Sequence, residues 1–67
     1  MTFPDNLTPA ERRAVETLIE LHEPALVARS HGVAMSTVRT QLLKACIKAG
    51  GTTTLGMVVM YLRSQQQ

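Results

Sequence analysis

Four segments of the chain carry hydrophobic residues at helical spacing, and turn-forming residues separate them. The first segment opens with "LTPAE", where Thr8 can cap a helix, Pro9 suits its first position and Glu11 completes a capping box. "LHEP" ends this helix, because the residue before a proline avoids the helical region. A second, short helix is expected over 24–30, and Gly32 is well suited to the left-handed conformation that stops it.

A third helix is expected from Met35 or Ser36 to Ala49, where "GG" stops it. When its residues are placed at about 100° intervals, the face toward the core consists of Val38, Leu42, Ala45 and Ala49. Leu43 and Ile47 fall on the opposite side, among polar and charged residues. The third helix is therefore basic and also apolar on more than one side.

A fourth helix is expected over 54–64, after "TTT", which offers an N-cap. This helix is too apolar for a single buried stripe. No segment shows the clean alternation of a strand. We therefore predict an all-α, compact four-helix domain over 7–64, with a flexible lead-in over 1–6 and a frayed polar tail over 65–67.

The composition narrows the range of functions. A chain of 67 residues makes one small domain, which buries only about 60% of its unfolded surface. Cys46 is the single cysteine and is expected to pack in the core, while His22 and His31 stand apart in expected turns, so neither a metal site nor a cofactor is predicted. Paired carboxylates, an activated nucleophile and a phosphate-binding glycine loop are all missing, which argues against an enzyme. Without a visible signal peptide or membrane-spanning run, a cytoplasmic location is expected.

Charge is distributed unevenly, although the net charge is only +2. The first 23 residues hold all five acids and two of the seven basic residues, which gives −3. Residues 24–67 carry the other five basic residues and no acid, which gives +5. A one-sided charge of this kind indicates a polyanionic partner, and chance in a short chain is the alternative explanation.

Two short helices joined by a glycine-containing turn, the second rich in cations, form the helix-turn-helix pattern, whose second helix lies in the major groove of DNA. A longer match adds to this pattern, since "LTPAERRAVETLI" and "LVARSHGVAMSTVRTQL" resemble the opening helix and the helix-turn-helix of the LuxR-type (GerE-like) domain of bacterial transcriptional regulators. The resemblance covers residues 7 to about 62 and implies a four-helix fold that binds double-stranded DNA. The chain departs from the family at Ala34, Gln41 and Thr54, where Ser, His and Arg are common.

The cations of the second and third helices are the first candidates for DNA contact. Arg39 matches the Lys of the family's Thr-Val-Lys and can read guanine or hold a phosphate. Lys44 and Lys48 lie along the same helix and suit phosphate contacts. Arg29 can touch the neighbouring DNA backbone or oppose the dipole of its own helix. For each cation the alternative is a solvated surface residue.

Hydroxyl and apolar residues complete the candidate recognition helix, 35–49. Three hydroxyl residues near its start suit base or phosphate contact, or capping: Ser36, Thr37 and Thr40. Leu43 can meet a thymine methyl group. A contact with another protein is the alternative for both Leu43 and Ile47, and Ile47 can also pack against the fourth helix.

One face of the apolar fourth helix must pack on the core, and the other resembles the dimerising surface of the LuxR-type domain, with candidate residues Met57, Val58, Tyr61 and Leu62. We therefore expect a sequence-specific DNA-binding transcriptional regulator that acts as a homodimer. It lacks a sensor of its own and is either a standalone regulator or part of a larger one. The alternative is a protein-interaction module that binds another regulator or RNA polymerase and modulates transcription.

Overall fold

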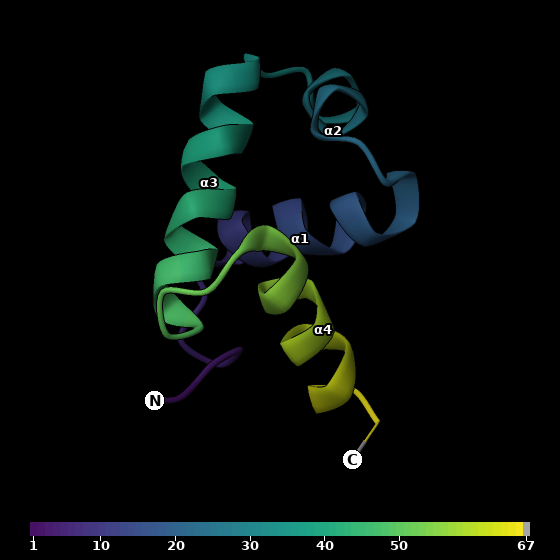
Figure 1. Ribbon diagram of the computed structural model, residues 1–67. Coiled ribbons are helices and arrows are strands. Elements are labelled where there is room, and N and C mark those ends of the chain that lie inside the picture. The colour runs from purple at the N-terminus through teal and green to yellow at the C-terminus, as the bar shows by residue number, and fades with distance from the viewer. Residues whose placement is uncertain (67) are drawn as a thin grey trace.

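The computed structural model describes residues 1–66 and contains four α-helices joined by short connections (Figure 1). They are α1 (Pro9–Leu21), α2 (Pro24–His31), α3 (Met35–Lys48) and α4 (Thr54–Ser64). The predicted all-α, four-helix architecture is confirmed, and no strand occurs in the described part of the chain.

Local chemistry explains where the helices begin and end. Thr8 and Glu11 form the expected capping box at the start of α1, since the Glu11 N–H donates to Thr8 Oγ1 at 3.2 Å and the Thr8 N–H donates to Glu11 Oε1 at 3.0 Å. The end of α1 is closed by His22 in the left-handed region, with φ 70°, and the end of α2 by Gly32, with φ 65°. At α4, Thr53 Oγ1 accepts from the Gly56 N–H at 3.1 Å.

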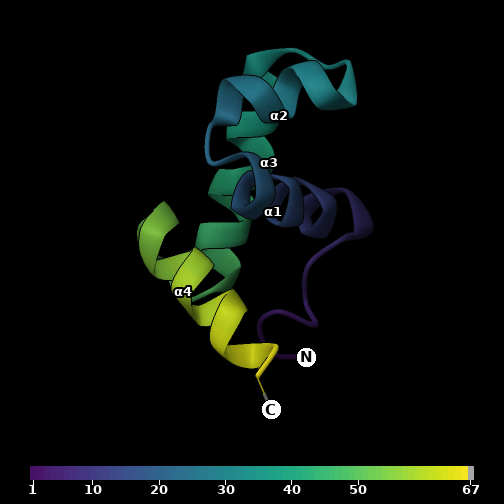
Figure 2. The ribbon, with the colours of Figure 1, turned by 90° about the vertical axis from the view of Figure 1, so that its right-hand side faces the viewer.

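The helices are arranged around α3, which runs along one side of the molecule (Figure 1). α2 lies beside the N-terminal end of α3, α4 lies beside its C-terminal half, and α1 crosses its middle and also packs against α2 (Figures 1 and 2). The N-terminus and the end of α4 lie at the end of the molecule opposite α2. The two long sides of α3 therefore differ, because three helices cover one side and leave the other uncovered.

The core is made of residues from all four helices. Its fully buried members are Ala14, Val15, Val27, Val38, Ala45 and Met57. The predicted inner face of the third helix is confirmed, because all four of its residues, including Leu42 and Ala49, are buried. Cys46 is also buried, as expected of a packing residue.

A partly buried ion pair ties the start of α1 to the end of α3. Lys48 Nζ lies 2.6 Å from Glu11 Oε1, and the two side chains are 30% and 6% exposed. The sequence pattern gave no indication of this contact, because the two residues are far apart in the chain and each has a plausible local role. The Lys48 ammonium group therefore helps to hold α1 and α3 together.

The N-terminal segment, 1–6, which is predicted as a flexible lead-in, contacts the helices in the structure. The Phe3 ring meets the Tyr61 ring edge-on, with centroids 6.4 Å apart, and the Pro4 carbonyl accepts from Arg12 Nη2 at 2.9 Å. Asn6 Nδ2 donates to the Lys48 carbonyl at 3.2 Å. Apolar burial of Phe3 is the physical reason. Of the predicted frayed tail, 65–67, the last residue lies outside the described residues.

Within residues 1–66, no helix combines the length and the apolar character needed to cross a bilayer. The same range holds no cluster of three His, Cys, Asp or Glu side chains able to bind a metal ion. His31 instead lies 2.9 Å from Thr17 Oγ1 through its Nε2 atom and links α2 to α1.

Replacing Lys48 by Met keeps most of the aliphatic stem and leaves the Glu11 carboxylate without its charged partner. We expect the free energy of unfolding to fall by about 2–3 kcal/mol, because a buried charge then has neither water nor a cation. Glu11→Gln should cost less, since Lys48 is exposed enough to be hydrated when unpaired. Thermal unfolding at pH 7, followed by circular dichroism, measures both variants. Equal losses contradict this explanation.

The same pair makes stability depend on pH. Burial by itself raises the pKa of Glu11, but hydrogen bonds from Lys48 and Thr8 outweigh it and hold the pKa below its ordinary value of 4.5. A carboxyl group whose pKa is lowered by folding stabilises the protein above its unfolded pKa, and this contribution is lost as the pH falls through the folded pKa. As the pH falls below 4.5, the free energy of unfolding of the native chain should therefore decrease more steeply than that of the Glu11→Gln variant.

Candidate nucleic-acid interface

A short turn joins α2 to α3, as the predicted helix-turn-helix requires. Gly32 ends α2 with φ 65° and ψ 35°, and α3 begins at Met35, so the turn spans residues 32–34. The Val33 N–H donates to the Ala28 carbonyl at 3.0 Å, which holds the turn against α2. Buried Val27 and Ala28 fix α2 in the core. The orientation of α3 is therefore set by packing on one side, and its other side remains open.

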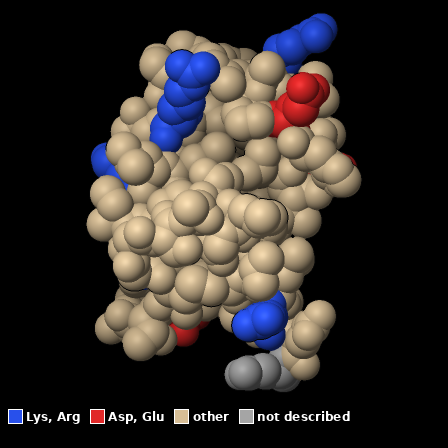
Figure 3. Space-filling model, in the orientation of Figure 1, with Lys and Arg blue, Asp and Glu red and all other residues tan. Residues whose placement is uncertain are grey.

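The open side of α3, called here the α3 outer face, consists of its exposed residues Ser36, Thr37, Arg39, Thr40, Leu43, Lys44 and Ile47. It brings together six of the eight residues predicted to contact DNA. The chain has no acidic residue from position 24 onward, so Arg39 and Lys44 have no carboxylate neighbour on their own helix. Figure 3 shows Lys and Arg side chains over the upper part of α3 without an acidic side chain beside them. The α3 outer face is therefore positively charged.

Hydroxyl groups lie beside these cations. Five residues line a shallow depression on the α3 outer face: Ser36, Thr37, Thr40, Gln41 and Lys44. The Thr40 hydroxyl donates its proton to the Ser36 carbonyl at 2.9 Å. Because that proton is already used, Thr40 Oγ1 can offer a ligand only its lone pairs. The Gln41 Oε1 atom is buried and has no hydrogen-bond partner within residues 1–66.

The N-terminus of α3 lacks a side-chain cap. Ala34 occupies the cap position in an extended conformation, with φ −69° and ψ 151°, and no side chain accepts from the first turn. The alternative cap, Ser36, lies inside the helix. Unpaired N–H groups and the positive end of the helix dipole are features that favour an anion.

Two further predicted contacts lie outside the α3 outer face. Arg29 is exposed in the last turn of α2, where it also complements the helix dipole. Lys48 is removed from the candidate interface, because its ammonium group lies 2.6 Å from a buried carboxylate. Its side chain is 30% exposed, so the structure gives Lys48 a role in the fold, and its assignment as a phosphate contact stays a prediction.

Leu43 and Ile47 are each 61% exposed. This exposure argues against the alternative in which Ile47 packs against the fourth helix, and α4 instead meets α3 at Cys46, whose Sγ lies 3.8 Å from Thr54 Oγ1. Leu43 lies one turn after Arg39, and both border a depression that is also lined by Pro24, Leu42, Cys46 and residues 52–54. Leu43 and Ile47 are thus largely open to solvent.

The fourth helix departs from the prediction at two of its four candidate dimer residues. Met57 is fully buried and Tyr61 is 3% exposed, so neither can contact a second copy. The Tyr61 hydroxyl donates to Glu16 Oε2 at 2.5 Å and accepts from Arg12 Nη1 at 3.4 Å. Burial and the Glu16 carboxylate raise the pKa of Tyr61. Both residues belong to the core because they are four positions apart and share one side of α4.

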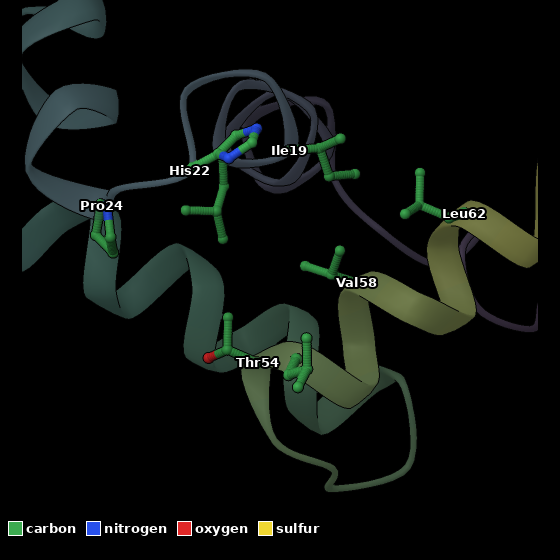
Figure 4. Close-up of a pocket in the computed structure, with 8 residues that line it drawn as sticks. Ile19, His22, Pro24, Thr54, Val58 and Leu62 are labelled. Carbon is green, nitrogen blue, oxygen red and sulfur yellow. The ribbon is translucent and has the colours of Figure 1, made fainter.

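The other side of α4 is open and apolar. Its exposed or half-buried residues form one stripe at helical spacing, which is called here the α4 stripe: Leu55, Val58, Val59 and Leu62. Its residues Leu55, Val58 and Leu62, together with the end of α1, border a groove of about 640 Å³. In this groove Val58 and Leu62 face Ile19, and His22 and Pro24 lie at one end (Figure 4). The excess of apolar residues in α4 was the signal for this surface in the sequence.

Comparisons with protein-family models, curated proteins and solved structures give no match for this chain. The resemblance to the LuxR-type domain therefore stays a prediction. The functional interpretation depends on the residues of the α3 outer face and of the α4 stripe.

The missing cap of α3 gives a direct test of the local geometry. Ala34→Thr supplies an acceptor oxygen at a residue that already has the extended cap conformation, whereas Ala34→Val has the same shape without the oxygen. We expect Thr to exceed Val in stability by about 1 kcal/mol. Denaturant unfolding of the two variants measures the difference. Identical stabilities show that α3 does not begin at this position.

Proposed function

We propose that the chain is a sequence-specific DNA-binding regulator of transcription that places α3 in the major groove. The observation that carries the proposal is the acid-free, cationic α3 outer face held open by a helix-turn-helix frame. The resemblance of residues 7 to about 62 to the LuxR-type domain supports the same function. A regulator of this kind acts in the cytoplasm, at the bacterial nucleoid.

Each residue of the interface has a role that follows from its chemistry. Arg39 carries a planar guanidinium group that can read guanine O6 and N7 or bind a phosphate. Lys44 suits a phosphate, which positions the helix without reading sequence. Thr40 can accept from a base amino group but cannot also donate, because its proton is held by the Ser36 carbonyl. Ser36 and Thr37, in the uncapped first turn, suit a phosphate oxygen.

We further propose that two copies associate through the α4 stripe. A small domain benefits from covering exposed apolar surface with a second copy, and a symmetric dimer presents two recognition helices to two half-sites. Of the dimer residues expected from the sequence, Val58 and Leu62 belong to this stripe. Leu55 and Val59 extend it.

The groove between α1 and α4 favours a second candidate function. An apolar groove of this size is the kind of surface into which another protein inserts a helix. On this view the chain is a protein-interaction module that binds another regulator or RNA polymerase. DNA binding separates the two candidates, since the second one requires no affinity for DNA.

Selection from a random duplex library, followed by titration of the selected site at several salt concentrations, tests DNA binding. With Arg29, Arg39 and Lys44 as phosphate contacts, we expect log K to fall with log salt with a slope of about −3 per protomer. Arg39→Ala should lower affinity for the selected site by about tenfold or more. Arg13→Ala removes the same charge from the exposed side of α1 and serves as the control.

Absence of binding at low salt contradicts the proposed function. Equal affinities of Arg39→Ala and Arg13→Ala contradict the assignment of α3 as the recognition helix, because only net charge then matters. Retained affinity with a slope near zero contradicts the phosphate contacts.

The proposed dimer can be tested with two substitutions on opposite sides of α4. Leu62→Glu should abolish self-association on DNA, because it places a charge in the α4 stripe. Met60→Glu is the control, since Met60 and Leu62 are 40% and 42% exposed and lie on opposite sides of the helix. Sedimentation velocity with and without the selected duplex measures the stoichiometry. A dimer that survives Leu62→Glu and is lost in Met60→Glu places the interface elsewhere.

A further inference from the structure

We infer that Leu43 reads the C5-methyl group of a pyrimidine next to the base contacted by Arg39. The inference rests on the proposed DNA-binding function and adds a chemical class of target to it. The methyl group is carried by thymine and by 5-methylcytosine, which present the same surface in the major groove.

The first step is the position of Leu43 on the α3 outer face. Its side chain is 61% exposed and lies at the border between the α3 outer face and the connection that leads to α4. A single exposed leucine is ordinary on a protein surface. Leu43, however, lies in the middle of the cationic face, one turn after Arg39 and one residue before Lys44. A helix that docks through these two cations necessarily brings Leu43 against the same partner.

The second step is the direction of the side chain. In a helix the Cα–Cβ bond tilts toward the N-terminus, so a side chain covers the turn that precedes its own Cα. This tilt directs Leu43 toward the turn of Arg39, and both residues border the depression that Pro24 and residues 52–54 also line. A guanidinium group bound to guanine and an isobutyl group beside it fit two neighbouring bases.

The third step is the chemistry of the groove. The floor of the major groove presents hydrogen-bond donors and acceptors for every base pair, and the C5-methyl group is its apolar feature. A leucine against a polar base edge leaves that edge unpaired, whereas a leucine against a methyl group removes apolar surface from water. A contact between Leu43 and a methyl group is thus the contact that leaves no base edge without its hydrogen bonds.

Ile47 provides a matched comparison, because it is also 61% exposed on the same face. It lies four residues, or about 6 Å, further along α3. In a helix-turn-helix the N-terminal part of the recognition helix contacts the bases. Ile47 is therefore farther from the base edges than Leu43 and is not assigned a methyl group.

The test uses the duplex selected from the library, synthesised in three forms. One form is natural, one has deoxyuridine in place of every thymidine, and one has 5-methylcytosine in place of every cytosine. Fluorescence anisotropy gives Kd for the native chain, Leu43→Ala and Ile47→Ala with each form. Circular dichroism checks that the variants remain helical.

If the methyl group belongs to thymine, the native chain should bind the deoxyuridine duplex about three- to fivefold more weakly than the natural one. If it belongs to 5-methylcytosine, the native chain should bind the methylated duplex about three- to fivefold more tightly. In either case Leu43→Ala should bind the duplex with the methyl group and the duplex without it with equal Kd. Ile47→Ala should keep the ratio of these two Kd values that the native chain shows. General effects of the methyl group on DNA shape cancel in this comparison.

The inference is overturned if the native chain binds all three duplexes with equal affinity in a salt-dependent manner, and the proposed function then still stands. It is also overturned if Leu43→Ala keeps the native ratio, or if the ratio is lost only in Ile47→Ala. Failure to bind any duplex at low salt overturns the proposed function together with the inference.

Discussion

The buried carboxylate of Glu11 is the constraint on which the arrangement of the helices depends. Its Oε1 atom accepts from the Thr8 N–H at 3.0 Å and from Lys48 at 2.6 Å. A buried charge is tolerated only when its partners are held in place, so Thr8 sets the start of α1 and Lys48 is tied to the same point. The start of α1 and the end of α3 are therefore joined. α2 and α4 pack on this helix pair and take their positions from it.

This constraint also shapes the proposed interface. One side of α3 is committed to the core through Val38, Leu42 and Ala45, and its last cation is committed to Glu11. What remains is a face with two free cations, a short series of hydroxyl groups and two exposed apolar residues. A phosphate backbone alone accounts for the cations. Leu43 needs a target of another kind, which is why readout of a methyl group by this residue completes the proposal.

The two sides of α4 illustrate how a small domain distributes its hydrophobic residues. Tyr61 is buried although it is amphipathic, because Glu16 and Arg12 satisfy its hydroxyl group at the rim of the core. This leaves the α4 stripe uncovered, next to the groove that Ile19 borders. A chain of 67 residues has too small an interior to bury all of its apolar residues alone. The proposed association with a second copy would cover this uncovered stripe.

Local rules in the sequence were enough to determine the helices and the inner face of α3. Caps, prolines and glycines act over three or four residues, and the hydrophobic period places Val38 and Leu42 on one side whatever they pack against. For the same reason the candidate interface was largely predictable, since Arg39, Lys44 and Leu43 lie opposite that core face. Only the tertiary structure decided the roles of Lys48, Met57 and Tyr61. Their partners are distant in the chain, and a helical period cannot tell which of two apolar sides of α4 is buried or which cation a buried carboxylate recruits.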